Sequence, residues 1–242
     1  MTRLILHIFF IQFFLFGTAN MAMCKKPDPR VSKALQIVRQ NSNLSESVGQ
    51  LIVVFNGNES DDSAWLVALE KKGNRWKAAS EAIEAGIGRN GFAAPGQKRE
   101  GDGKSPTGFF SLGQLFGYEK DIDTQMPHQQ TSAEDKWIDD PESPDYNKYV
   151  KGNTNAKSFE RLKISSDEYK LCMVINYNTN PVMKGMGSAI FLHLSFGNSP
   201  NSSSGCVVIT QKNMANLLKW MRPELNPSIL MGTEDILMKG IK

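Results

Sequence analysis

The chain has 242 residues, of which 40% are hydrophobic and 22% are charged, and its formal net charge at pH 7 is +3. This composition is that of a chain with one sizeable core, and it excludes an intrinsically disordered protein. Lys and Arg form no dense block, so the charge pattern gives no reason to expect nucleic acid as a partner.

The first residues carry the pattern of a secretory signal peptide, which we place at residues 1–22. Arg3 supplies positive charge, residues 4–16 are almost wholly apolar, and small residues follow between Gly17 and Ala22. The apolar run is shorter than the roughly 20 residues that a membrane span needs. We therefore expect export to the periplasm (the cell envelope), with membrane contact only through the uncleaved signal.

Three cysteines, Cys24, Cys172 and Cys206, make an odd set. Exported proteins often pair their cysteines, so at least one thiol is free or pairs between molecules. Cys172 alternates with Leu171 and Met173 in a predicted strand, which indicates a buried position, and a disulfide between Cys24 and Cys172 is left open. The cysteines and the three scattered histidines show no zinc-binding spacing, so we expect no metal and no cofactor.

Residues 23–49 form a linker and a short N-terminal helix. Apolar residues recur at helical spacing between Val31 and Val38, and the helix is predicted to end at Asn41. We place a single domain at residues 50–242, because strand-like runs begin there. The first predicted strands, of which the second and third form a hairpin, are residues 51–55, 64–70 and 75–78.

The middle of the chain is rich in glycine and charge. The sequence GIGRNG, residues 86–91, has glycines near the spacing of a dinucleotide-binding fingerprint, but no strand–helix unit surrounds it, and we interpret it as turns. Residues 119–161 are polar and are predicted to be a loop-rich insertion, of the kind that often forms lids or binding loops. Disorder is the alternative, although Trp137 and Tyr146 could fix this segment. Within it, we expect Asp139 or Asp140 to cap a turn.

Strands return in the last third of the chain, at residues 169–177, 189–195 and 205–209. Thr210 is the predicted N-cap of a helix with one apolar face, and residues 228–231 form a last strand. The sum is a mostly β fold with a few helices.

His193 and Cys206 are the candidate catalytic pair. In a strand, His193 faces away from its two leucine neighbours, and the polar loop of residues 196–204 can return the chain as a hairpin that brings the imidazole beside the thiol. A cysteine attacks a carbonyl as a thiolate and needs such a base. Gly205 leaves room for a substrate, and the amides of Gly205 and Cys206 are candidate oxyanion donors. The alternative is that both residues are ordinary members of the core.

This segment resembles the catalytic signature of the YkuD-like L,D-transpeptidase family, in which a strand histidine is followed by Ser-His-Gly-Cys. Residues 203–206, Ser-Ser-Gly-Cys, occupy those places, and residues 103–109 resemble the family's Thr-Pro-x-Gly stretch. Residues 88–91 and 137–141 are similar to features of one branch. The sequence departs from the signature at Ser204, where the family has histidine, and at Val208, where the family has a basic or amide residue. One branch of the family shares both departures. The resemblance covers roughly residues 50–232.

The resemblance implies a YkuD-like fold, a mixed β-sandwich or barrel with a few helices. It also implies a peptidoglycan-modifying cysteine acyltransferase, in which His193 is the general base and Cys206 forms a thioester with a stem peptide. The carbonyl that orients the imidazole would then belong to the backbone.

The resemblance leaves the acceptor open, because an amine would give transpeptidation and water would give carboxypeptidase action. A wall-binding module without turnover and a thiol hydrolase of other peptides are further alternatives, and the oligomeric state is open. The residues expected to bind the substrate or its oxyanion are Gly205, Ser204, Ser203, Lys104, Arg89 and Arg99. The positive charges of Lys104, Arg89 and Arg99, each taken singly, also fit a solvated surface.

Overall fold

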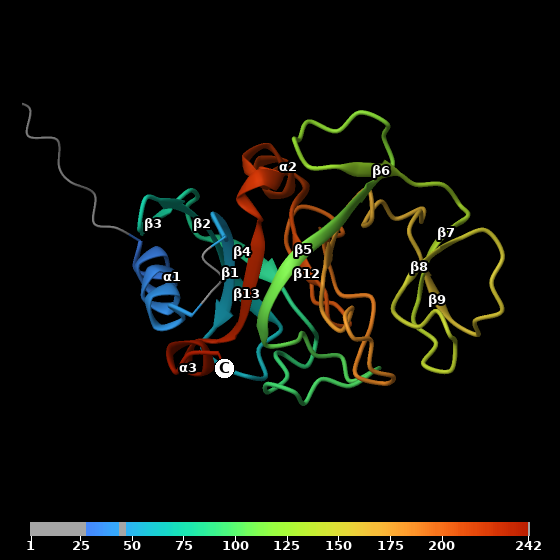
Figure 1. Cartoon of the computed structure of the whole chain (residues 1–242), viewed down its shortest axis with the longest axis horizontal. Coiled ribbons are helices and arrows are strands. Elements are labelled where there is room, and N and C mark those ends of the chain that lie inside the picture. Colours follow the sequence, from blue (N-terminus) through green and yellow to red (C-terminus); the bar gives the residue numbers. More distant parts are fainter. Residues whose placement is uncertain (1–27, 44–46, 242) are drawn as a thin grey trace, which may run out of the picture.

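The computed structural model describes residues 28–43 and 47–241 (Figure 1). The predicted signal peptide and Cys24 lie outside the described residues. Within the described part of the chain, no helix combines the length and the apolar character needed to cross a membrane.

The described chain contains three α-helices, one short 3-10 helix and thirteen strands. The N-terminal elements are α1 (Pro29–Gln40), β1 (Gln50–Asn56), β2 (Ser63–Lys72), β3 (Arg75–Ala78), β4 (Ile83–Gly86) and β5 (Gly108–Gly117). The predicted insertion carries β6 (His128–Gln130), β7 (Asp135–Ile138), β8 (Tyr149–Lys151) and β9 (Phe159–Arg161). The C-terminal elements are β10 (Leu171–Ile175), β11 (Phe191–Leu194), β12 (Val207–Ile209), α2 (Gln211–Trp220), the 3-10 helix η1 (Pro223–Leu225), β13 (Ser228–Thr233) and α3 (Glu234–Met238).

The main sheet closes on itself. Its strands follow the order β1-β13-β5-β10-β11-β12-β4-β2-β3, and β2 also pairs with β1, so the path returns to its start as a barrel-like sheet. Strand β6 adds to β5 at one side. The fold is thus mostly β with a few helices, which confirms the fold class expected from the sequence.

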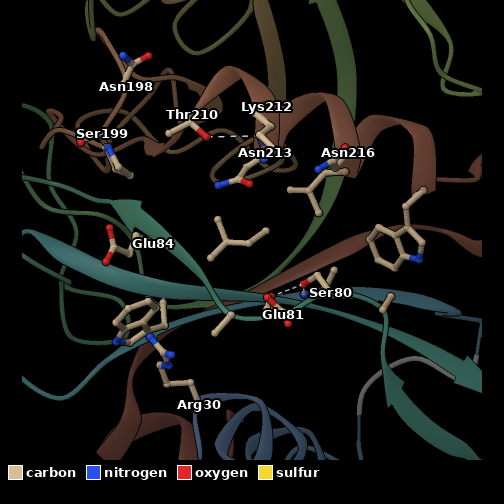
Figure 2. Close-up of a pocket in the computed structure, with 18 residues that line it drawn as sticks. Arg30, Ser80, Glu81, Glu84, Asn198, Ser199, Thr210, Lys212, Asn213 and Asn216 are labelled. Atoms are coloured by element: carbon tan, nitrogen blue, oxygen red, sulfur yellow. Dashed lines mark hydrogen bonds between the residues drawn. The ribbon is translucent and has the colours of Figure 1, made fainter. Parts of the chain in front are cut away.

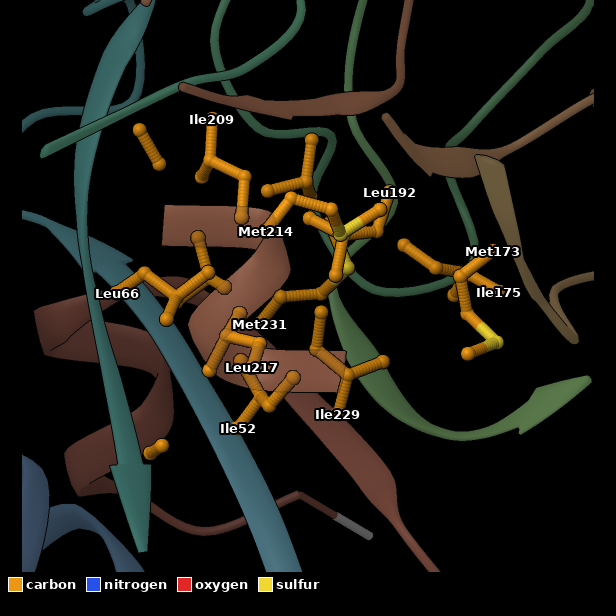
Figure 3. Close-up of a cluster of buried hydrophobic side chains, with 14 of the residues drawn as sticks. Ile52, Leu66, Met173, Ile175, Leu192, Ile209, Met214, Leu217, Ile229 and Met231 are labelled. Atoms are coloured by element: carbon orange, nitrogen blue, oxygen red, sulfur yellow. The ribbon is translucent and has the colours of Figure 1, made fainter. Parts of the chain in front are cut away.

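The barrel interior holds the main hydrophobic core (Figure 3). Alternate residues of the strands point inward, such as Ile52 on β1 and Leu192 on β11, and helix α2 adds Met214 and Leu217. The side chain of Thr210 accepts a hydrogen bond from the amide of Asn213, as expected of the N-cap. Each such fully buried side chain contributes about 1.5–3 kcal/mol by leaving water.

Helices α1 and α3 cover the outer side of the barrel near β1 (Figure 1). Helix α1 begins two residues before Val31, because Asp28 caps it and Pro29 starts it, and it ends at the C-cap Asn41 as predicted. The Asn41 side chain donates to the Leu237 carbonyl oxygen at 2.9 Å, which fixes α3 against α1. Helix α3 has no counterpart among the predicted elements.

The predicted insertion is an ordered unit. Strands β8, β7 and β9 form a separate three-stranded sheet, and Trp137 and Tyr146 are buried, with exposed fractions of 7% and 2%. The Trp137 indole packs edge-on against Phe191 of β11, with ring centroids 5.4 Å apart. The insertion therefore covers the outer face of β11.

The connection between β11 and β12 differs from the predicted hairpin. The two strands are parallel, with His193 opposite Val208, so residues 195–206 form a crossover that returns to the start of the next strand. Parallel neighbours need a connection of about a dozen residues or more, whereas a hairpin needs only a few. The polar loop is long enough for either path, and its contacts with residues 87–89 select the crossover.

Candidate active site

His193 and Cys206 face the same side of the barrel. His193 lies opposite Val208, and Cys206 precedes Val208 by two residues, so all three side chains point to one face. That face is the outer one, because Leu192 and Leu194 fill the barrel interior. The expected alternation along β11 is therefore present, although the strands run in parallel.

Three segments that stood out in the sequence meet around the cysteine. The Ser203 amide donates to Ile87 O, and the Arg89 amide donates to Ser203 O, each at 2.8 Å. The Ser105 hydroxyl donates to Gly205 O at 2.7 Å. The GIGRNG segment is thus a turn that supports the cysteine loop, in agreement with its interpretation as turns.

Gly205 is a position that only glycine fits. Its φ of +153° lies in a region that side chains disfavour, and an added Cβ would stand 2.9 Å from Lys104 O. The backbone of the 103–108 segment therefore closes on Gly205 from one side.

His193 and Cys206 line one cavity of about 430 Å³. Four of the residues that we expected to bind the substrate or oxyanion also line it: Arg89, Ser203, Ser204 and Gly205. Arg99 and Lys104 are not among the lining residues. The Arg99 guanidinium donates to the carbonyl oxygens of Gly96 and Lys98, and Lys104 contributes its backbone to the packing around Gly205.

The thiol of Cys206 is nearly buried, with 8% of the residue exposed. Its sulfur accepts a hydrogen bond from the Phe191 amide and donates to Ala189 O, both at 3.3 Å. Burial raises the pKa of the thiol to about 12, although the Phe191 amide lowers it and Glu160 adds a smaller rise. The resting cysteine is therefore a neutral thiol.

The imidazole of His193 is held by the backbone. Its Nδ1 lies 2.9 Å from Leu194 O, and because a carbonyl oxygen only accepts, Nδ1 carries the proton and Nε2 has the free lone pair. Burial lowers the pKa of His193, which keeps the ring neutral. Tyr169 packs edge-on against the ring at a centroid distance of 5.1 Å. The expected backbone orienting group is thus present.

No hydrogen bond joins this imidazole to the thiol within the described residues, since the thiol proton points to Ala189 O. The oxyanion donors also differ in their availability. The Gly205 amide donates to Ser203 Oγ at 3.0 Å, so it is engaged within the loop. The Cys206 amide is then the better candidate of the two.

The cavity has an acidic wall that the sequence analysis missed. It is formed by Glu100, Asp139, Glu160 and Glu168. Burial raises the pKa of both Asp139 and Glu160, and Asp139 Oδ1 is buried without a hydrogen-bond partner in the described structure. Two of these carboxylates come from the insertion, so only the fold brings them to the cysteine. The neighbouring Asp140 is the turn cap that we expected, since it accepts from the Glu142 amide.

Lys98 is a second residue that the sequence did not single out. It lines the same cavity, only 4% of it is exposed, and its ammonium binds Asp102 at 2.7 Å. Among several lysines in a glycine-rich segment, no pattern marked it as buried.

Comparison with known proteins decides the family. The YkuD family, described as L,D-transpeptidase catalytic domain, matches residues 59–233. This chain belongs to the YkuD family. The expected resemblance is confirmed, and membership places the chain among domains of L,D-transpeptidase type.

One solved structure resembles this YkuD chain, the helical cell shape determining protein Pgp2 from Campylobacter jejuni. It shares 13% sequence identity at a TM-score of 0.41, and the match covers 86% of this chain. The chain spans 59% of the length of that protein. No curated protein matches.

Proposed function

We propose that this chain is an exported cysteine acyltransferase that acts on peptidoglycan stem peptides. Cys206 is the nucleophile and His193 the general base. The observation that carries this proposal is their placement: His193 lies on β11, Cys206 directly precedes the adjacent parallel strand β12, and both side chains line one cavity. Family membership supplies the substrate class.

The reaction begins from a neutral pair. The thiol gives up its bond to Ala189 O and turns to His193 Nε2, which takes the proton as sulfur attacks the carbonyl of the diamino acid in the stem. The negative oxygen of the tetrahedral intermediate is stabilised by the Cys206 amide. The C–N bond then breaks, the imidazolium protonates the leaving amine of D-alanine, and a thioester remains on Cys206.

The second half restores the enzyme. An amine of another stem, or water, gives a proton to the neutral imidazole and attacks the thioester carbonyl. The C–S bond breaks, the thiolate recovers that proton, and the product leaves. Nucleophile and base are common to both acceptors, so the chain's own residues act in the same way in transpeptidation and in carboxypeptidase action.

The walls of the cavity suit a substrate with both kinds of charge. Arg89 is exposed at the rim and donates to Ser204 Oγ at 2.8 Å, so its guanidinium can bind a stem carboxylate. The carboxylates of the opposite wall can bind the side-chain ammonium of the diamino acid.

The test uses defined tetrapeptide stems, incubated with the protein alone or with an amine-bearing acceptor stem, with products read by mass. We expect release of D-alanine, and the appearance of a cross-link or a trimmed tripeptide identifies the acceptor. Cys206→Ala should abolish both products, while Cys172→Ala, which removes the other described thiol, should retain them. Failure to release D-alanine, or full activity of Cys206→Ala, would refute the proposal.

A further inference from the structure

A second hollow of about 760 Å³ lies away from the thiol cavity (Figure 2). One wall is one side of helix α2, from Lys212 to Trp220, and the other is the segment of residues 79–84, which includes the start of β4. In Figure 2, Asn213 and Asn216 of α2 lie across the hollow from Ser80 and Glu81. This volume is within the range of ligand sites. We call it the α2 groove.

A third hollow of about 410 Å³ adjoins both the α2 groove and the thiol cavity. This middle hollow shares Trp65 and Glu84 with the α2 groove, and it shares Asn201 and Ser202 with the cavity of Cys206. The three hollows therefore follow one another along the crossover loop. A track of this kind suits a segment of polymer better than a small molecule.

The walls of the α2 groove offer neutral hydrogen-bonding groups. The side-chain amides of Asn198, Asn213 and Asn216 line it, and none of them is hydrogen-bonded to another group in the described structure. Each amide can both donate and accept, which matches hydroxyl and acetamido groups. The indole of Trp220 adds flat apolar surface, of the kind that covers the C–H face of a sugar ring. The Trp65 ring is already covered by the Arg30 guanidinium, which lies 3.9 Å from the ring centroid.

The α2 groove has no excess of positive charge. Arg30 lines it but is ion-paired with Asp28 at 2.7 Å, and the other charged residues of the lining are Lys212, Glu81 and Glu84. A nucleic acid or another polyanion would need an excess of basic residues, and a free stem peptide would bring several carboxylates. A neutral ligand is the class that this lining favours.

We propose that the α2 groove binds the N-acetylated glycan strand of peptidoglycan, and that the middle hollow leads its stem peptide toward Cys206. This inference rests on the proposed function for the identity of the polymer. The recognition itself depends only on the groove, so glycan binding is independent of the thiol chemistry.

The test measures binding of chitotetraose, an N-acetylglucosamine tetramer, by calorimetry to the Cys206→Ala variant, which cannot turn over. We expect saturable binding that the double variant Asn213→Ala/Asn216→Ala weakens roughly tenfold, as for the loss of one or two neutral hydrogen bonds. Gln211→Ala is the matched control, because Gln211 is exposed on the same helix and does not line the groove. Circular dichroism melts confirm that all variants fold.

Maltotetraose, which lacks acetamido groups, tests the kind of glycan. Equal binding of both sugars would overturn the assignment to an N-acetylated strand. Absence of chitotetraose binding, or equal affinity in the double variant and the control, would overturn the α2 groove as a glycan site.

Kinetics separate this inference from the proposed function. The double variant should lose about tenfold in kcat/KM on polymeric peptidoglycan and be unchanged on a free tetrapeptide. Chitotetraose binding without any acyl transfer would refute the proposed function and retain a glycan site. Acyl transfer on free stems without chitotetraose binding would refute the glycan site alone.

Discussion

The buried, neutral thiol of Cys206 gives a prediction about its reactivity as pH is raised. A rise of the pKa from 9.0 to about 12 leaves roughly a thousandfold less thiolate at pH 8 than an ordinary cysteine has. Because a thiolate of higher pKa is more nucleophilic, each one reacts roughly 15–30 times faster. We therefore expect alkylation of Cys206 at pH 8 to be about 30- to 60-fold slower than that of an unhindered cysteine, before any loss from its burial.

The assay is alkylation by iodoacetamide between pH 6 and pH 11, with the modified peptide identified by mass so that Cys206 is followed separately from Cys172. The same protein in urea is the control, since unfolding returns the thiol to its ordinary pKa. The folded rate should still rise with pH above pH 10, where the unfolded rate has levelled off. A folded rate that levels off near neutral pH would refute the reasoning, because it would show a thiolate–imidazolium pair at rest.

Three further predictions concern the groups around this thiol. Gly205→Ala should lower the free energy of unfolding by about 1–3 kcal/mol through backbone strain, with more from the contact with Lys104 O, whereas Gly57→Ala, where an added Cβ meets nothing, should change the urea midpoint little; equal midpoints would contradict the packing described. Tyr169→Leu removes the ring that contacts His193, so kcat should fall severalfold to tenfold at unchanged KM, and an effect on KM alone would count against a positioning role. Because burial lowers the pKa of His193, the unfolded chain binds a proton near pH 6.5 that the folded chain does not; stability should therefore fall as pH drops through that value, and His193→Gln should flatten this fall, while an identical pH dependence in both proteins would exclude the shift.

The local features of this fold could be predicted from sequence, since they depend on neighbouring residues. The alternation along β11 placed His193 opposite to its leucine neighbours, and Thr210 marked the start of α2. Such signals reflect the strand and helix periods and the need to cap a helix. The buried position predicted for Cys172 is also confirmed.

Features that depend on distant segments could not be predicted. The direction of β12 is set by contacts of Ser203 with residues 87–89, and side-chain alternation is the same in parallel and antiparallel strands, so the hairpin expectation was wrong. Asp139 and Glu160 reach the cysteine only because the insertion folds over β11. The aromatic anchor for that packing, Trp137, was recognisable, but its partner on the barrel was not.

The most direct test of the central claim is to locate a covalent acyl adduct by mass. Incubation with a carbapenem, whose lactam carbonyl acylates active thiols, should add the mass of the intact compound to the peptide that contains Cys206. The adduct should be absent from Cys206→Ala, present in Cys172→Ala and slow to form in His193→Gln. An adduct on Cys172, or none on Cys206, would contradict acyl transfer at this site.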